Sequence, residues 1–205
     1  MNCTVATESV ARLFGFSSRD GETVMADTAP GAGGLMMLPF FNGERTPDLP
    51  RARGGLSGMD LDNLTRGNVY RAAMEGATCS LRNGYDAFQA AGLRFDAIRL
   101  TGGGSRSAAW RQMVADVFEL PVEVPEQTEG AAFGAALQAL WAHGRSNDGG
   151  DIAAIVGEHV QVNPALSAQP DPDVVGAYRT HYRLFLRHLE AAKLLYPNHR
   201  EADVS

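Results

Sequence analysis

Apolar residues recur at helical spacing over several stretches of the chain, separated by short apolar runs of the kind that form strands. The clearest helical repeat lies over residues 65–91, where one face carries Val69, Ala73, Ala77, Leu81, Tyr85 and Phe88. At about 1.5 Å per residue this helix is roughly 40 Å long and spans a whole domain. Gly76 and Gly84 lower its helix propensity, which predicts close packing against a neighbour at both glycines, and Gly92 supplies a stop signal.

The same reading predicts the remaining elements. Helices are expected over 7–14, 107–118, 131–143 and 173–196, and strands over 35–41, 54–59, 97–101 and 121–125. Residues 15–33 and 144–171 are interpreted as loop-rich, the second with a short helix at 152–156. Strands that alternate with helices form parallel sheets, so 97–101 and 121–125 should be neighbouring parallel strands backed by the long helix. We predict one α/β domain over residues 1–205.

Charge and composition exclude several classes of protein. A net charge of −6, with Lys and Arg scattered, argues against binding to nucleic acid. No apolar stretch is long enough to span a bilayer and nothing at the N-terminus resembles a signal peptide, so no membrane partner is expected. Cys3 and Cys79 are far apart and in no metal-ligand spacing, which fits a reducing cytoplasm. The sequence therefore predicts a cytoplasmic protein.

The most informative local feature is a glycine turn between a predicted strand and a predicted helix. Gly102, Gly103 and Gly104 place backbone without side chains directly before the helix that starts at Ser107. Such a turn lets backbone N–H groups and the helix N-terminus approach a ligand. A tight turn that needs glycine only for its dihedral angles is the alternative reading.

A resemblance to a known superfamily favours the first reading. An apolar strand that ends in Gly-Gly-x-Ser and leads into a helix resembles the adenosine motif of the actin-like ATPases. Residues 129–136 are similar to a second marker, a helix start rich in Gly and Ala, although a plain Ala-rich core helix is the alternative there.

Longer patterns narrow the resemblance to one family. Residues 54–75 fit the C-terminal signature of the FGGY carbohydrate kinases at every constrained position. Residues 38–47 resemble the loop that the xylulokinase branch carries as Gly-Glu-Arg-Thr-Pro, and residues 110–116 also look like that branch. The resemblance covers about residues 4–196.

The resemblance implies a ribonuclease H-like lobe, with a mixed sheet and helices on both faces, belonging to a two-lobed kinase. Such kinases transfer the γ-phosphoryl group of ATP·Mg²⁺ to a sugar hydroxyl. In the xylulokinase branch the acceptor is the C5 hydroxyl of D-xylulose and the product is D-xylulose 5-phosphate. Carried over by position, Gly102, Gly103 and Gly104 would line the adenine and ribose, and Ser107 stands where a relative contacts adenine with Asn. Arg106 lies over the base or points to solvent.

Other polar residues receive structural interpretations. Glu44 and Arg45 form either an ion pair that holds a cleft-facing loop or a plain surface pair, and we favour a structural role. Glu75 and Asp116 match family positions but are interpreted as structural carboxylates in helices. All five histidines are interpreted as surface or helix residues away from a site: His143, His159, His181, His188 and His199.

The resemblance also implies what lies outside this sequence. The family draws its catalytic aspartate, its sugar-binding residues and its first phosphate loop from the N-terminal lobe, and no Asp-x-Gly-Thr segment occurs here. We therefore assign no catalytic and no metal-ligating residue, with Mg²⁺ held through the nucleotide and the other lobe. We expect an N-terminally truncated lobe whose sheet lacks its first strands and which is inactive alone.

Three hypotheses about partners and function follow. The first is a D-xylulose kinase lobe that binds ATP or ADP itself and meets its sugar through the other lobe. The second is another FGGY sugar or polyol kinase. The third is a non-catalytic nucleotide-binding or regulatory module that pairs with another protein through an exposed sheet edge. A homodimer is compatible with each.

Overall fold

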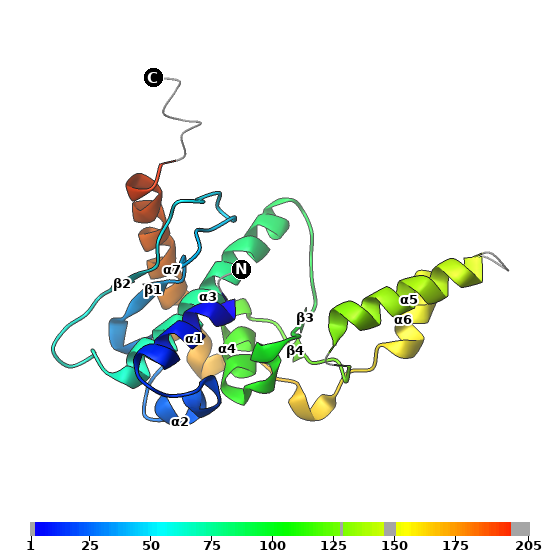
Figure 1. Ribbon diagram of the computed structural model, residues 1–205, viewed down its shortest axis with the longest axis horizontal. Coiled ribbons are helices and arrows are strands. Elements are labelled where there is room, and N and C mark those ends of the chain that lie inside the picture. Colours follow the sequence, from blue (N-terminus) through cyan, green and yellow to red (C-terminus); the bar gives the residue numbers. More distant parts are fainter. Residues whose placement is uncertain (1–2, 128, 146–150, 198–205) are drawn as a thin grey trace, which may run out of the picture.

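The structure is a computed structural model that describes residues 3–127, 129–145 and 151–197, and helices dominate it (Figure 1). Its helices are α1 (Cys3–Leu13), α2 (Gly21–Val24), α3 (Arg66–Ala90), α4 (Ala108–Phe118), α5 (Gly130–Arg145), α6 (Ile152–His159) and α7 (Pro172–Leu195). Four short 3₁₀ helices are η1 (Ser18–Asp20), η2 (Ala32–Gly34), η3 (Gly103–Arg106) and η4 (Pro164–Leu166). The strands are β1 (Met36–Leu38), β2 (Gly55–Ser57), β3 (Ile98–Arg99) and β4 (Val122–Glu123).

The long helix predicted over 65–91 is confirmed as α3, and local chemistry fixes both of its ends. The Oγ1 atom of Thr65 accepts a hydrogen bond from the backbone N–H of Asn68 at 3.2 Å, which is an N-cap. Beyond its last turn, Gly92 takes a φ of 89°, a left-handed conformation that ends the helix without strain.

The two interior glycines of α3 differ from each other. A Cβ atom at Gly76 would lie 2.1 Å from the carbonyl oxygen of Met37, so β1 crosses α3 in backbone contact there, as predicted. At Gly84 a Cβ atom would meet no described atom within 4 Å, so the prediction of close packing is wrong at this position.

The predicted parallel pair is formed, but the four strands lie in two separate sheets. β3 and β4 are parallel neighbours, with Ile98 opposite Val122, and β1 and β2 are antiparallel, with Met37 opposite Leu56. In the described part of the chain these pairs remain apart, so the single mixed sheet with helices on both faces is not formed. Paired strands lie about 4.7–4.9 Å apart, and no described strand stands between β1 and β3 to join them.

The loop-rich segment is more ordered than its composition suggests. Helix α6 extends the short helix predicted at 152–156, and the backbone beyond it covers the outer edge of β4. Ala168 forms an antiparallel bridge with Val122, and Val162 forms one with Pro125. Residues 146–150 of this segment lie outside the described residues.

The N-terminal segment departs from prediction in two ways. Helix α1 begins at Cys3 rather than near Thr7, and Thr7 is a buried residue inside this helix whose hydroxyl donates to the carbonyl of Thr4. The predicted loop over 15–33 contains η1, α2 and η2. Of these, α2 and η2 pack beside α3, and Glu22 of α2 reaches the start of α4.

A single apolar core joins these elements. It is formed mainly by buried residues of α1, β1, α3, α4, β4 and α7, including Met36, Met74, Val114 and Phe185. Helices α5 and α6 pair with each other and extend away from this core (Figure 1).

Candidate nucleotide site

The glycine turn after β3 needs glycine for its dihedral angles at one position only. Gly102 has φ 80° and ψ −161°, a region that residues with a side chain rarely adopt. Gly103 has no positive φ, and a Cβ atom there would meet only Thr4 Cγ2, at 3.9 Å. At Gly104 a Cβ atom would lie 3.4 Å from the ring of Trp110. The alternative reading, a turn that needs glycine for its geometry, therefore explains Gly102 and leaves Gly103 unexplained.

Hydrogen bonds hold this turn in place. The backbone N–H and the hydroxyl of Ser105 both donate to the carbonyl oxygen of Gly102, at 3.2 and 2.8 Å. Arg111, from the first turns of α4, donates to the carbonyl oxygen of Ser105 at 2.8 Å. The backbone of the turn is thus fixed before any ligand arrives.

Ser107 acts as the N-cap of α4. Its hydroxyl oxygen accepts from the backbone N–H of Trp110 at 3.1 Å and donates to Oε1 of Glu22 at 2.6 Å. The same carboxylate oxygen accepts the backbone N–H of Ala109 at 3.1 Å. The bond from Ser107 lowers the pKa of Glu22, so this carboxylate is ionised at the helix N-terminus. Glu22 lies in a four-residue helix and shows no local signal in the sequence.

A cavity of about 410 Å³ lies beside the turn, within the size range of small-ligand sites. Gly103, Arg106 and Ser107 line it together with Thr4 and Arg19, and Glu8 and Glu22 add two carboxylates. Of the four predicted nucleotide residues, Gly103 and Ser107 face this space, whereas Gly102 shapes the turn. Arg106 is exposed at its rim.

The second superfamily marker lies next to the first. A Cβ atom at Gly130, the first residue of α5, would lie 3.8 Å from Cγ2 of Thr101. The Gly- and Ala-rich helix start therefore borders the glycine turn, although the two are almost thirty residues apart in the sequence.

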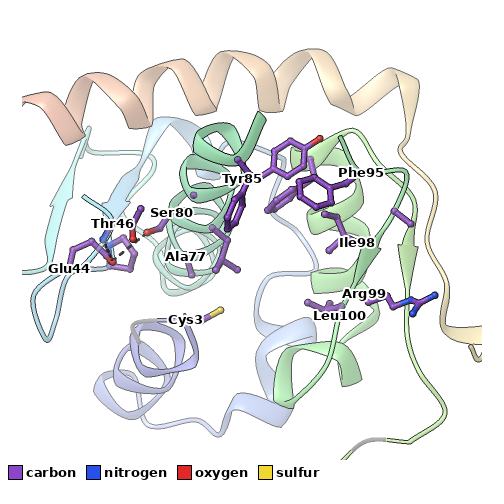
Figure 2. A pocket seen from close by; sticks show the side chains of 16 residues that line it. Cys3, Glu44, Thr46, Ala77, Ser80, Tyr85, Phe95, Ile98, Arg99 and Leu100 are labelled. Atoms are coloured by element: carbon purple, nitrogen blue, oxygen red, sulfur yellow. Dashed lines mark hydrogen bonds between the residues drawn. The ribbon is translucent and has the colours of Figure 1, made fainter. Parts of the chain in front are cut away.

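Glu44 and Arg45 belong to a different part of the molecule. Glu44 lines a second cavity with residues of α3 and β3 (Figure 2). Its Oε1 atom accepts the backbone N–H groups of Arg45 at 2.8 Å and Thr46 at 3.2 Å. Oε2 accepts the Ser80 hydroxyl at 3.5 Å. These contacts support the structural interpretation of Glu44, which holds its own loop, and they place this loop away from the cavity beside the glycine turn.

Glu75 lies in a buried polar cluster that sequence reasoning missed. Its Oε1 atom accepts the backbone N–H of Gly31 at 2.9 Å and lies 3.6 Å from Arg71. Oε2 lies 3.4 Å from Nε2 of His181. Burial raises the pKa of Glu75 to about 7 and lowers that of His181 to about 4.

His181 is 5% exposed and lies in α7, so of the two interpretations, surface or helix, it is a helix residue, and it is buried. It lies three residues after Tyr178 and four before Phe185, on the buried face of α7, and the packing of that face carries the histidine inward. His143 and His159 lie in helices, His188 lies 3.3 Å from the Ser57 hydroxyl, and His199 is outside the described residues.

Asp116 is a structural carboxylate, as interpreted from the sequence. It accepts the side-chain amide of Gln112 and the backbone N–H of Asp171, both at 2.8 Å, and so fastens the start of α7 to α4. Within the described residues there is no cluster of three or more His, Cys, Asp or Glu side chains that a metal ion would need, and no helix long and apolar enough to cross a membrane.

Comparison with known proteins defines the class. Residues 9–143, which include the glycine turn and the Glu44 loop, match the model of the FGGY family of carbohydrate kinases, C-terminal domain. The chain therefore belongs to this family, and its resemblance to that family is confirmed. The match starts in α1 and ends in α5.

Three individual proteins to which this chain is similar are sugar kinases. A xylulose kinase of Haemophilus influenzae is 38% identical over 189 residues, which are 92% of this chain and 38% of the relative. A gluconokinase of Bacillus subtilis is 32% identical over 87% of this chain and 34% of its own length. The ligand-bound xylulose kinase of Lactobacillus acidophilus superposes with a TM-score of 0.85 at 24% identity, covering 95% of this chain and 39% of that structure. The last likeness shows that this chain shares the fold of that structure.

The chain thus spans less than two fifths of the length of the curated relatives that are named above. The part of those relatives that this chain matches is the C-terminal domain of the FGGY carbohydrate kinases.

Proposed function

We propose that this chain is the nucleotide-binding lobe of an ATP-dependent sugar kinase, with D-xylulose as the sugar. The observation that carries the nucleotide assignment is Gly103. It lies on a hydrogen-bonded turn and faces a cavity, and neither its dihedral angles nor its packing requires glycine. A bare backbone at that point lets a flat ligand approach closely.

The residues present fit an adenosine group. Backbone of Gly102, Gly103 and Gly104 would lie against the base and ribose, and the start of α5 at Gly130 would bound the other side. Ser107 would act through the helix cap, since its hydroxyl is committed to Trp110 and Glu22. Glu22 beside the helix N-terminus already occupies the position that a phosphate would favour, so we place the phosphates away from α4.

The bound nucleotide would supply the phosphoryl group, and Mg²⁺ would be held through its phosphates and the part of the kinase that this chain does not represent. We propose that the base for the sugar hydroxyl and the sugar-binding residues lie in that part as well. By itself this chain would bind nucleotide without catalysing transfer.

D-xylulose is favoured over other sugars because the similarity to a xylulose kinase, 38% identity, extends over 92% of the chain. The similarity to a gluconokinase keeps gluconate as the second candidate. A non-catalytic nucleotide-binding module is the third.

A chimeric kinase tests this assignment. This chain would replace the 189 matched residues of the Haemophilus influenzae xylulose kinase, and phosphorylation of D-xylulose and of gluconate would be measured in a coupled assay with ATP and Mg²⁺. We expect turnover of D-xylulose by the chimera and none by this chain alone. A folded chimera without kinase activity, or turnover by the isolated chain, would contradict the proposal.

A further inference from the structure

Glu22 presents a carboxylate to the cavity beside the glycine turn, and two hydrogen bonds hold it there. Its Oε1 atom accepts the hydroxyl of Ser107 at 2.6 Å and the backbone N–H of Ala109 at 3.1 Å. Gly103 of the turn lines the same cavity of about 410 Å³. Both bonds end on Oε1, so Oε2 keeps its lone pairs for a further donor.

The residue before Glu22 explains how the carboxylate comes to this place. Gly21 is buried, and a Cβ atom there would overlap the phenol ring of Tyr70, a buried residue of α3. Only glycine therefore lets α2 pack this closely on α3. Since α2 is seated on the core through Gly21, the next residue reaches the N-terminus of α4 from a fixed backbone position.

The carboxylate of Glu22 only accepts hydrogen bonds, because the bond from Ser107 lowers its pKa and keeps it ionised. An adenosine nucleotide has donors in two places, the exocyclic amine of the base and the hydroxyls of the ribose. Its phosphates and the ring nitrogens of its base are acceptors. The ribose carries two O–H groups on adjacent carbons, which one carboxylate can accept together. A carboxylate likewise holds the ribose 2′-hydroxyl in dinucleotide-binding folds.

The direction in which the phosphates leave also favours the ribose at this position. The 5′-carbon and the diol are attached on opposite sides of the ribose ring, so a diol that faces Glu22 directs the phosphates away from α4. Phosphates that lay beside the ionised carboxylate would be repelled. The bare backbone of Gly103 faces the same cavity, where the flat parts of the nucleotide can approach it.

We propose that Glu22 is the residue by which this chain selects ribonucleotides. Oε2 accepts the hydroxyls of the ribose diol of a bound adenosine nucleotide, while Oε1 stays bonded to Ser107 and Ala109. Glu8 lines the cavity from α1, and the bonds that fix Glu22 to α4 do not reach it. This inference rests on the proposed function, in which the glycine turn binds adenosine.

The test compares two ligands that differ only in the diol. Calorimetry would measure the dissociation constants of ADP and 2′,3′-dideoxy-ADP for the wild-type chain and for Glu22→Gln, which keeps an acceptor oxygen for Ser107 and Ala109 but removes the charge. We expect the wild type to bind ADP at least about tenfold more tightly than the dideoxy analogue, and Glu22→Gln to lose most of this preference. A variant that is only less stable would weaken both ligands alike and leave their ratio unchanged.

Glu8→Gln is the matched control, since it removes one negative charge from the same cavity and leaves Glu22 in place. We expect this variant to keep the wild-type ratio of the two dissociation constants. The chimeric kinase gives the same ratio from the KM values for ATP and 2′,3′-dideoxy-ATP, where binding to the chain alone is too weak to titrate.

Several results would overturn the proposal: equal binding of ADP and its dideoxy analogue by the wild type, or the same ratio in wild type and Glu22→Gln. If Glu22→Gln instead changed the preference for ADP over inosine diphosphate, the carboxylate would contact the amine of the base. Binding of D-xylulose alone that Glu22→Gln abolishes would also overturn it, because the diol would then belong to the sugar. Nucleotide binding without a preference for the diol contradicts this inference alone, whereas no nucleotide binding at all contradicts the proposed function.

Discussion

The Oε2 atom of Glu75 lies 3.4 Å from the Nε2 atom of His181, and neither atom has a hydrogen-bond partner among the described residues. The two side chains join α3 to α7 in the core, and the other carboxylate oxygen of Glu75 holds the loop at Gly31. The pair therefore links three segments through groups that titrate.

This pair predicts opposing effects of pH on stability. Glu75 has a folded pKa of about 7 against 4.5 unfolded, so the folded protein binds an extra proton between these values and its free energy of unfolding rises as pH falls from 7 to 4.5. His181 has a folded pKa of about 4 against 6.5, so there the unfolded protein binds the extra proton and stability falls as pH drops from 6.5 to 4.

Single substitutions should separate the two effects. Relative to wild type, Glu75→Gln should lose stability on acidification and His181→Gln should gain it, each by a few kcal/mol at most. Chemical denaturation between pH 4 and 7.5 measures both slopes. Parallel pH profiles of the two variants would show that the pair does not titrate as described.

Gly76 should be the least replaceable glycine of α3. A Cβ atom at Gly76 would overlap the carbonyl oxygen of Met37, so Gly76→Ala should cost about 1–3 kcal/mol, or more, because β1 must move. Gly84→Ala is the control and should gain about 0.5–1 kcal/mol, since its Cβ meets open space in a helix. Equal unfolding midpoints for the two variants would contradict the contact between β1 and α3.

Ser107 should contribute to stability more than to nucleotide contact. Ser107→Ala removes the N-cap of α4 and the bond to Glu22, which we expect to cost about 1–2 kcal/mol in the free energy of unfolding. Because the pKa of Glu22 is lower in the folded than in the unfolded protein, its ionisation stabilises the folded protein at pH values above the unfolded pKa of about 4.5. Part of the cost of Ser107→Ala should therefore vanish as the pH falls below that value. Unchanged stability with lost ADP binding would instead make the hydroxyl a nucleotide ligand.

Local chemistry explains what the sequence predicts well. The ends of α3 follow from Thr65 and Gly92, whose capping roles depend on neighbouring residues alone. The parallel pairing of β3 with β4 follows from strand order and handedness. The family assignment rests on spacings that the sequence itself contains.

Tertiary contacts explain the errors. Nothing local distinguishes Thr7 as an interior residue of a helix from Thr7 as its first residue, or shows that His181 lies on the buried face of α7. Three consecutive glycines do not reveal that Gly102 alone takes a positive φ. The separation of the two sheets depends on which strands lie side by side, which is a property of the whole fold.

The most direct test of the nucleotide site is calorimetric titration of the wild-type chain and Gly103→Val with AMP, ADP and ATP. Gly157→Val, on exposed α6, is the control. We expect the wild type and the control to bind all three nucleotides weakly, with affinities that depend little on phosphate count. Gly103→Val should bind none, with its stability largely retained because Gly103 needs no positive φ. Equal binding by wild type and Gly103→Val would show that the glycine turn does not contact the nucleotide.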